Sequence, residues 1–479
     1  MGYAARSLIR PILTVGRLSI AVAIFFAGPA IAGDPLASNN GMYPDPQKAN
    51  QGYFGRYNIA NLDYPDARPT VQWQPGGGLD APLNQGNAKD YMLALKKYLE
   101  PTMRVLIEDA QNWDAKKARW YDMVWQGAGD PSDPTSGRDA IMNSYGGQIV
   151  PSSSWSEPYR PTTEYMQNYG VIYFDELAAS MLGKVWADVY APDLSEQSFP
   201  DGSIVVKAEA ATVQPYQWPS PDTGSVLAGA AEWKVFRPTT AEQKAHQIDP
   251  NLPLNNSVQT VYPFQLAIKV KDSIASPETN WVFMGFVYDA RVDGSPWEKF
   301  VPAGMMWGND PQYAALPYGV PLDENGNPDT DKLKQTWVNP EAPPFVKDTL
   351  GWGGRMAAPM DVAVRHNVLL PSGQRFTGPD RFQASSCMSC HGTSEFPFSV
   401  NLYPSPNRTF PPDGAQFPMY TPGSDNWAQW FQNRRGDVPQ SGNIGGKALD
   451  YDLVTMFSLS VWAEATGKVG FAFEDMDGH

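Results

Sequence analysis

The sequence predicts an α+β protein with a helical N-terminal region, an antiparallel β-rich middle domain and a small, mostly α C-terminal domain. Three observations predict this: apolar stripes at helical spacing between residues 87 and 189, strand-like runs separated by turn residues between 201 and 307, and helical patterns again after 345. A chain of 479 residues usually forms two or three hydrophobic cores. We therefore expect a removable leader at 1–32, followed by an N-terminal region at 33–195, a middle region at 196–344 and a C-terminal region at 345–479.

The N-terminal region begins with an arm at 33–85 that is rich in Asn, Gly and Pro, without a regular period. From Asn87 a stripe of Tyr and Leu predicts a helix that Pro101 breaks and Met103 resumes. Segments 115–125 and 171–189 predict two further helices. The buried face of the second is expected to contain Phe174, Leu177, Ala178, Met181, Leu182 and Val185.

Four strands are predicted in the middle region, at 203–208, 232–236, 264–270 and Trp281–Tyr288. Segment 264–270 alternates apolar and polar residues, so one of its faces is expected to meet water. Trp281–Tyr288 is apolar on both faces, which is typical of a central strand.

The C-terminal region predicts two helices. Segment 426–434 carries Trp427 and Trp430, and segment 450–465 places Leu453, Phe457, Val461 and Trp462 on one face.

The first 32 residues have the order of a secretory signal peptide. Arg6, Arg10 and Arg17 precede or flank an apolar run at 18–27, no acidic residue is present, and Ala30-Ile-Ala32 forms a small-x-small cleavage site. The alternative is an uncleaved anchor, but a run of about ten residues is too short to cross about 30 Å of hydrocarbon. We expect cleavage after Ala32 and a periplasmic protein.

The chain is acidic, with a net charge of −15, and loss of the leader would make it more acidic still. Such a charge makes nucleic acid and anionic membranes poor partners. No later segment reaches the length of a transmembrane helix. We expect neither a nucleic-acid partner nor a transmembrane segment.

Both cysteines of the chain lie in one motif, Cys387-Met-Ser-Cys390-His391. C-x-x-C-H is the attachment motif of haem c. One helical turn separates the thiols, which matches the spacing of the two vinyl groups, and the adjacent His then lies at the iron. The motif predicts one covalent haem c bound by Cys387 and Cys390, with His391 as proximal iron ligand. An exported protein suits this cofactor, because bacteria attach haem c after translocation.

Three other uses of the motif fit less well. A disulfide between positions i and i+3 closes a strained ring and leaves His391 unexplained. A thioredoxin-like pair normally follows a strand, which 384–386 does not resemble. A zinc site needs four ligands, and His246, His366 and His479 are the only other histidines.

The motif and its neighbours, Ser-Cys-Met-Ser-Cys-His-Gly at 386–392, resemble those of c-type cytochromes. This resemblance implies a cytochrome c-like C-terminal domain in which helix 450–465 packs across the attachment helix. Trp281–Tyr288, 302–310 and 351–355 are also similar to segments of large uncharacterised periplasmic cytochrome c proteins. That second resemblance implies no substrate.

The distal side of the iron has several candidate ligands. In the cytochromes that this chain resembles, the ligand is usually a Met in a proline-flanked loop, which implies Met419. Met456 is expected to fill a helix core instead, and His366 would give bis-His ligation. An open, five-coordinate iron is a further alternative. Arg355, Arg375 and Arg381 are candidate partners of the haem propionates, and Trp427 and Trp430 are candidates for lining the haem crevice.

These features together predict a periplasmic mono-haem c-type cytochrome that transfers electrons, with a larger domain that docks a redox partner of unknown identity or a substrate. The alternative is a haem enzyme or haem-based sensor with an open iron site, so electron carrier is preferred to catalyst. The absence of a second C-x-x-C-H motif argues against a di-haem peroxidase.

Overall fold

The chain is described by a computed structural model that covers residues 34–37, 52–70, 72–79, 81–127, 134–155, 157–313, 321, 323–324, 329–348, 368–369, 386–400, 402, 404–406, 417–418, 420–421, 424–440 and 446–468. The main strands are β1 (Tyr145–Pro151), β2 (Tyr165–Phe174), β3 (Ile204–Ala211), β6 (Trp233–Arg237), β7 (Ser257–Lys271), β8 (Trp281–Tyr288), β9 (Phe300–Met306) and β10 (Thr336–Val338). Three two-stranded pairs are β4 (Pro219–Ser220) with β5 (Gly224–Ser225), β11 (Val368–Leu369) with β13 (Phe417–Pro418), and β12 (Glu395–Phe396) with β14 (Lys447–Ala448). The helices are α1 (Ala88–Glu108), α2 (Ala115–Ala118), α3 (Glu176–Val185), α4 (Thr240–Ile248), α6 (Cys387–His391), α7 (Asp425–Ala428) and α8 (Leu453–Thr466).

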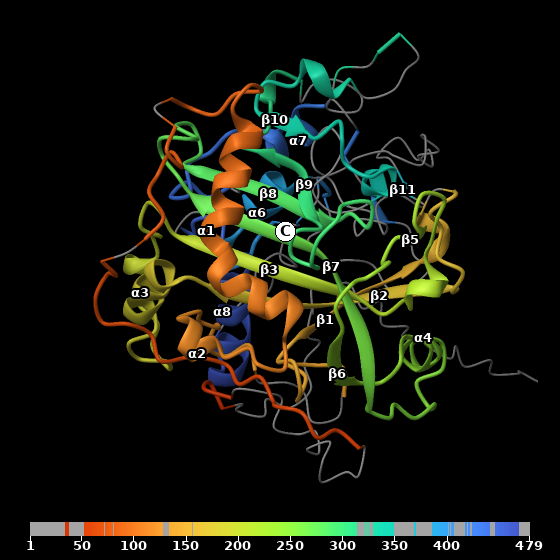
Figure 1. Cartoon of the computed structure of the whole chain (residues 1–479). Coiled ribbons are helices and arrows are strands. Elements are labelled where there is room, and N and C mark those ends of the chain that lie inside the picture. Colours follow the sequence, from red (N-terminus) through yellow and green to blue (C-terminus); the bar gives the residue numbers. More distant parts are fainter. Residues whose placement is uncertain are drawn as a thin grey trace, which may run out of the picture.

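One antiparallel sheet forms the centre of the molecule, with strand order β1-β2-β3-β7-β8-β9-β10 (Figure 1). The first part of the long strand β7 pairs with β6, and the later part pairs with β3. Helices and an antiparallel sheet together make this an α+β protein, as the sequence predicts.

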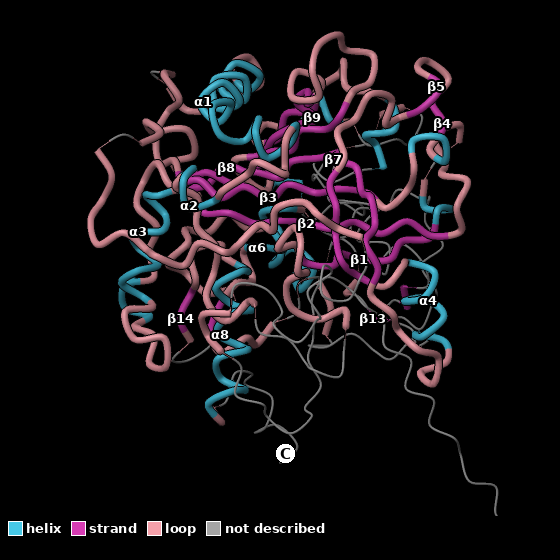
Figure 2. The backbone as a smooth tube through the Cα atoms, turned by 60° about the horizontal axis from the view of Figure 1, so that its bottom comes forward, coloured by secondary structure: helices cyan, strands magenta, loops and turns pink. Residues whose placement is uncertain are grey.

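Helices cover the two faces of the sheet differently. Because successive side chains of a strand point to opposite faces, Val282 and Met284 of β8 lie in the core that contains α1, whereas Trp281 and Phe283 lie in a second core. That second core contains residues of α3, α6 and α8. Figure 2 shows α1 on one side of the sheet and α6 and α8 on the other.

All four predicted strands are present, as parts of β3, β6 and β7 and as the whole of β8. The central position and complete burial predicted for β8 are confirmed. The wet face predicted for 264–270 is wrong, because Gln265 and Lys269 are 2% and 4% exposed. Both polar side chains are paired: Gln265 donates to Glu209, and Lys269 donates to Asp452.

Two of the predicted N-terminal helices differ from the observed ones at Pro101 and in segment 115–125. α1 continues through Pro101 and is not broken. A proline inside a helix costs about 3 kcal/mol, but Leu95, Leu99 and Met103 on either side of it are at most 1% exposed, and each such burial stabilises by about 1.5–3 kcal/mol. Segment 115–125 is helical only in α2, which ends at Arg119 in a left-handed conformation.

Segment 171–189 is a strand followed by a helix. Residues up to Phe174 belong to β2, and Asp175 begins α3 by accepting a hydrogen bond from the amide of Ala178. The predicted apolar face is nevertheless buried: Leu177 is 1% exposed, and the other five predicted residues belong to the second core.

The C-terminal helices form close to their predicted bounds. α7 and the 3₁₀ turn Gln429–Phe431 replace the single helix expected at 426–434, and α8 replaces 450–465. Leu453 and Trp462 are buried as predicted, but Phe457 and Val461 are only partly buried. The inner face of α8 consists of Met456, Leu459 and Ala463, with Thr455 and Ser458.

The second core contains residues from all three predicted regions, among them Met181, Phe283, Met388 and Leu459. The boundaries at 195/196 and 344/345 stay predictions.

Candidate functional site

Helix α6 carries the C-x-x-C-H motif and is anchored to the sheet at its first turn. Ser386 is its N-cap: the Ser386 hydroxyl accepts a hydrogen bond from the Ser389 amide at 2.9 Å. The same hydroxyl donates to Oδ1 of Asn309 at 2.9 Å, and Asn309 lies just after β9. The start of the motif is therefore tied to the end of a sheet strand.

The two cysteines lie one helical turn apart on α6. Met388 and Ser389 between them are buried, whereas Cys387 and Cys390 are partly exposed at the edge of the second core. No disulfide joins the two thiols. The helix thus inserts the middle of the motif into the protein and leaves both cysteines only partly buried at the edge of the second core.

A hydrogen bond determines which nitrogen of His391 can bind a metal. Nδ1 of His391 lies 2.9 Å from the carbonyl oxygen of Tyr451. Because a carbonyl oxygen can only accept, Nδ1 must carry the proton in this contact. Nε2 of the neutral ring then presents its lone pair, which is the arrangement that metal-binding histidines normally have.

The surroundings keep His391 neutral. Burial is the largest cause that lowers its pKa, to about 3, and the charge of Lys269 lowers it further; the hydrogen bond with Tyr451 opposes both. A ring with this pKa is unprotonated throughout the physiological pH range, as a metal ligand must be.

The ring of His391 also packs against the sheet. Its centroid lies 5.0 Å from that of Phe283 on β8, and Phe283 lies 6.0 Å from the ring of Tyr451. A hydrogen bond on one side and an aromatic contact on another restrict rotation of the imidazole.

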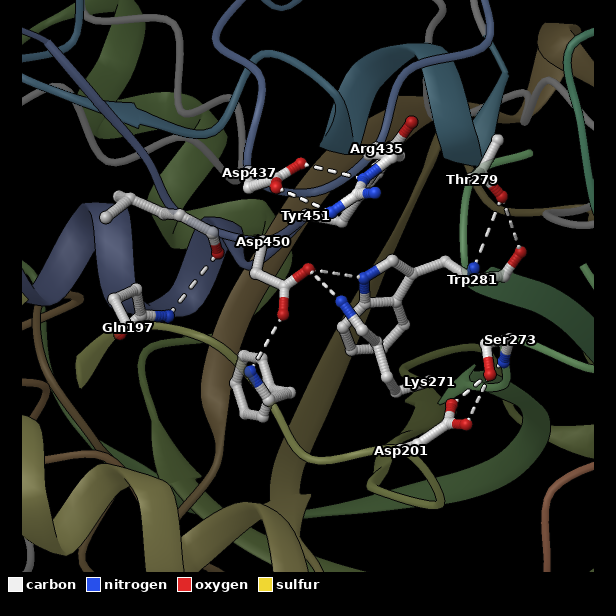
Figure 3. A network of polar contacts seen from close by, with 12 residues as sticks. Gln197, Asp201, Lys271, Ser273, Thr279, Trp281, Arg435, Asp437, Asp450 and Tyr451 are labelled. Atoms are coloured by element: carbon white, nitrogen blue, oxygen red, sulfur yellow. Dashed lines mark hydrogen bonds and ion pairs between the residues drawn. The ribbon is translucent and has the colours of Figure 1, made fainter. Parts of the chain in front are cut away.

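Tyr451 belongs to a short segment with unusual backbone geometry. Asp450 and Tyr451 have φ values of 53° and 62°, a left-handed conformation that non-glycine residues seldom adopt. Asp450 holds the segment in place: its carboxylate accepts from the Trp281 indole at 2.8 Å, the Lys271 ammonium at 2.5 Å and the Phe199 amide at 2.8 Å. Figure 3 shows dashed lines from one oxygen of the Asp450 carboxylate to the Trp281 indole and to Lys271.

A second buried ion pair lies beside the first. Nζ of Lys269 donates to Oδ1 of Asp452 at 2.7 Å and to the carbonyl oxygen of Tyr451 at 3.0 Å. Asp452 is the N-cap of α8 and accepts from the amide of Thr455. The carbonyl that orients His391 is thus connected to both β7 and the start of α8.

The structure brings together Cys387, Cys390 and His391 on one turn of helix. Met456 is 1% exposed and packs in the second core, as do Trp427 and Trp430. Several other candidates lie outside the described residues: the leader with its cleavage site after Ala32, Met419, His366, Arg355, Arg375 and Arg381.

The sequence reasoning missed Tyr451, Phe283 and Lys269. Tyr451 acts through its backbone, so its side-chain type gives no signal. Lys269 did give a signal, because it is a charged residue in an otherwise apolar stretch of strand. The alternation of polar and apolar residues predicts a face in contact with water, however, and not a buried ion pair.

No family model matches the chain, and neither a curated protein nor a solved structure matches it. In the parts of the chain that the structure describes, no helix has both the length and the apolar character needed to cross a membrane.

Proposed function

We propose that this protein is a periplasmic mono-haem c-type cytochrome that transfers electrons, with a small, mostly α, cytochrome c-like C-terminal region that packs on the sheet and a β-rich region that docks a redox partner. The observation that carries the proposal is the orientation of His391: its Nδ1 donates to Tyr451, so its Nε2 lone pair is available for iron.

The donor set of α6 fits haem c. Cys387 and Cys390 would hold the porphyrin by two thioether bonds, and both residues are only partly buried. His391 would bind the iron with its neutral ring, and the low pKa caused by burial removes competition from protons. Bound haem c supplies one-electron redox chemistry, with a potential that depends on the axial ligands and their hydrogen bonds.

The chain's own residues would lower the cost of electron transfer by restricting movement. Ser386 anchors α6, Tyr451 and Phe283 hold His391, and the buried pairs of Asp450 and Asp452 hold Tyr451. An axial ligand that barely moves between oxidation states keeps the reorganisation small.

Acid–acetone extraction of periplasmic protein tests the attachment. The haem should remain with the wild-type chain, and the Cys387→Ala/Cys390→Ala double variant should lose it, while Cys390→Ala alone keeps one thioether. Intact mass of the same sample should show a chain that begins at Gly33 and carries one haem. Extractable haem in the wild type would contradict the proposal.

An optical spectrum of the same protein separates the carrier from its alternative. Low-spin bands with a weak sulfur-to-iron absorption in the ferric form indicate a six-coordinate electron carrier. High-spin bands with carbon monoxide binding indicate an open site, and the haem enzyme or sensor would then replace the carrier.

A further inference from the structure

His391 shares its hydrogen-bond acceptor with a lysine. The carbonyl oxygen of Tyr451 accepts from Nδ1 of His391 at 2.9 Å and from Nζ of Lys269 at 3.0 Å. A carbonyl oxygen has two lone pairs, so both donors can bind at once.

Lys269 cannot easily leave this position. Its side chain is 5% exposed, and Asp452, which is completely buried, holds Nζ at 2.7 Å. The same nitrogen lies over two aromatic rings, 5.1 Å from the centroid of Trp281 and 5.5 Å from that of Phe199, which adds two cation–π contacts.

A second donor to the Tyr451 carbonyl weakens the hydrogen bond that His391 makes to the same oxygen. Electron density drawn toward the Lys269 ammonium makes the oxygen a poorer acceptor for Nδ1–H of His391. A histidine with a weaker Nδ1 hydrogen bond has less imidazolate character and donates less electron density through Nε2. Less donation, together with a nearby positive charge, favours the reduced form of a bound metal centre.

We propose that Lys269 is a positioning residue for His391: by sharing the Tyr451 carbonyl, it orients the imidazole and raises the reduction potential of the haem. This inference rests on the proposed function. It assigns a redox-tuning role to a buried strand residue that is distant in sequence from the motif.

The structure offers a matched control in Lys271. It lies two residues further along β7, is 11% exposed, and pairs with the buried Asp450 at 2.5 Å. Its ammonium also lies over Trp281, at 5.2 Å. Lys271 therefore resembles Lys269 in its low exposure, its ion pair and its aromatic contact, but its ammonium donates to Asp450 rather than to the Tyr451 carbonyl.

The experiment compares Lys269→Met and Lys271→Met as full-length holoproteins. We expect Lys269→Met to lower the reduction potential clearly more than Lys271→Met, and to move the paramagnetically shifted ring protons of His391 in the oxidised protein. Equal changes in both variants, or no change in Lys269→Met, overturn the inference even when the haem stays covalently attached. A wild-type chain without covalent haem defeats the proposed function itself.

A milder pair of variants covers the case in which Lys269→Met does not fold. Asp452→Asn keeps an N-cap for α8 but removes the counter-charge of Lys269, and Asp450→Asn does the same for Lys271. The potential should rise more in Asp452→Asn than in Asp450→Asn. Equal shifts would count against the role of Lys269.

Discussion

At the scale of single residues, the carbonyl oxygen of Tyr451 determines which nitrogen of His391 is available. The left-handed conformation of Asp450 and Tyr451 turns this carbonyl toward the imidazole. Such a conformation costs on the order of 1–3 kcal/mol for a non-glycine residue and persists only where neighbouring contacts hold it. The three hydrogen bonds to Asp450 are such contacts.

The distal ligand is a second question for single residues. If the thioether of Met419 binds the iron, Met419→Ala should leave the haem attached, turn the ferric spectrum partly high-spin and lower the potential, because water replaces a soft sulfur. Optical spectra and a redox titration measure both effects.

Met456→Ala is the control for this prediction. Met456 is 1% exposed in the second core, so its loss should cost about 2–5 kcal/mol of stability without a change of spin state. If Met419→Ala is spectrally silent while His366→Ala or Met456→Ala changes the spin state, the assignment of Met419 is wrong.

At the scale of elements, α6 depends on its cap. Ser386→Ala removes the acceptor for the Ser389 amide and the donor to Asn309. We expect a loss of about 1–2 kcal/mol in the free energy of unfolding, together with a lower yield of haem-loaded protein, because the motif is less well ordered.

Ser424→Ala provides the comparison for Ser386→Ala. Ser424 caps α7 by accepting from the Trp427 amide at 3.3 Å. Urea denaturation should show that Ser424→Ala also lowers the free energy of unfolding, but its haem content should be that of the wild type. Equal haem content in both variants would show that the cap of α6 has no part in attachment.

Helix α3 has a pH-dependent cap. Burial raises the pKa of Asp175 to about 7, against the hydrogen bonds from the amides of Ala178 and Ile204. The folded state therefore keeps this proton up to about pH 7, while the unfolded state loses it near the ordinary aspartate pKa of about 4. Stability is complete below about pH 4 and falls as the pH rises toward 7.

Asp175→Asn removes the free-energy cost of ionising a buried carboxyl group. It keeps the cap, because Oδ1 accepts the hydrogen bonds from both amides. Its gain in unfolding free energy over the wild type should be near zero at pH 4 and on the order of 2–4 kcal/mol at pH 8. Denaturation curves across this range measure it. A gain that does not change with pH would show that Asp175 is ionised in the folded state.

At the scale of the whole molecule, the C-terminal segment and the sheet share one buried face. Lys269 and Lys271 pair with Asp452 and Asp450, and Met388 and Leu459 lie in the same core as Phe283. Removing one partner of a buried ion pair typically costs about 3–5 kcal/mol. The site therefore depends on residues almost 200 positions apart in the chain.

A fragment of residues 345–479 tests this dependence. Produced alone, it would expose the apolar surface that covers β8 and leave two carboxylates without their lysines, so we expect no cooperative unfolding transition by circular dichroism. The chain from residue 33 to 479 should unfold cooperatively. A fragment that folds and attaches haem alone would instead support the predicted boundary at 344/345.

The sequence alone determined the local features of this protein. The run Trp281–Tyr288 is apolar at every position, so its burial on both faces follows from the sequence. The spacing of Cys387, Cys390 and His391 predicts one helical turn, which α6 forms. Such features depend on neighbours within a few residues, so periodicity and motif spacing are enough to predict them.

Tertiary structure alone decided what the polar face of β7 contacts and which group orients His391. Alternation shows that Lys269 and Gln265 share a face, but not that Asp452 and Glu209 cover it. Pro101 likewise stays within α1 because the sheet buries its neighbours. Long-range contacts of this kind contribute several kcal/mol, which is as much as the intrinsic preference of a residue such as Pro101 for or against a helix. They cannot be predicted from the residues on either side in the sequence.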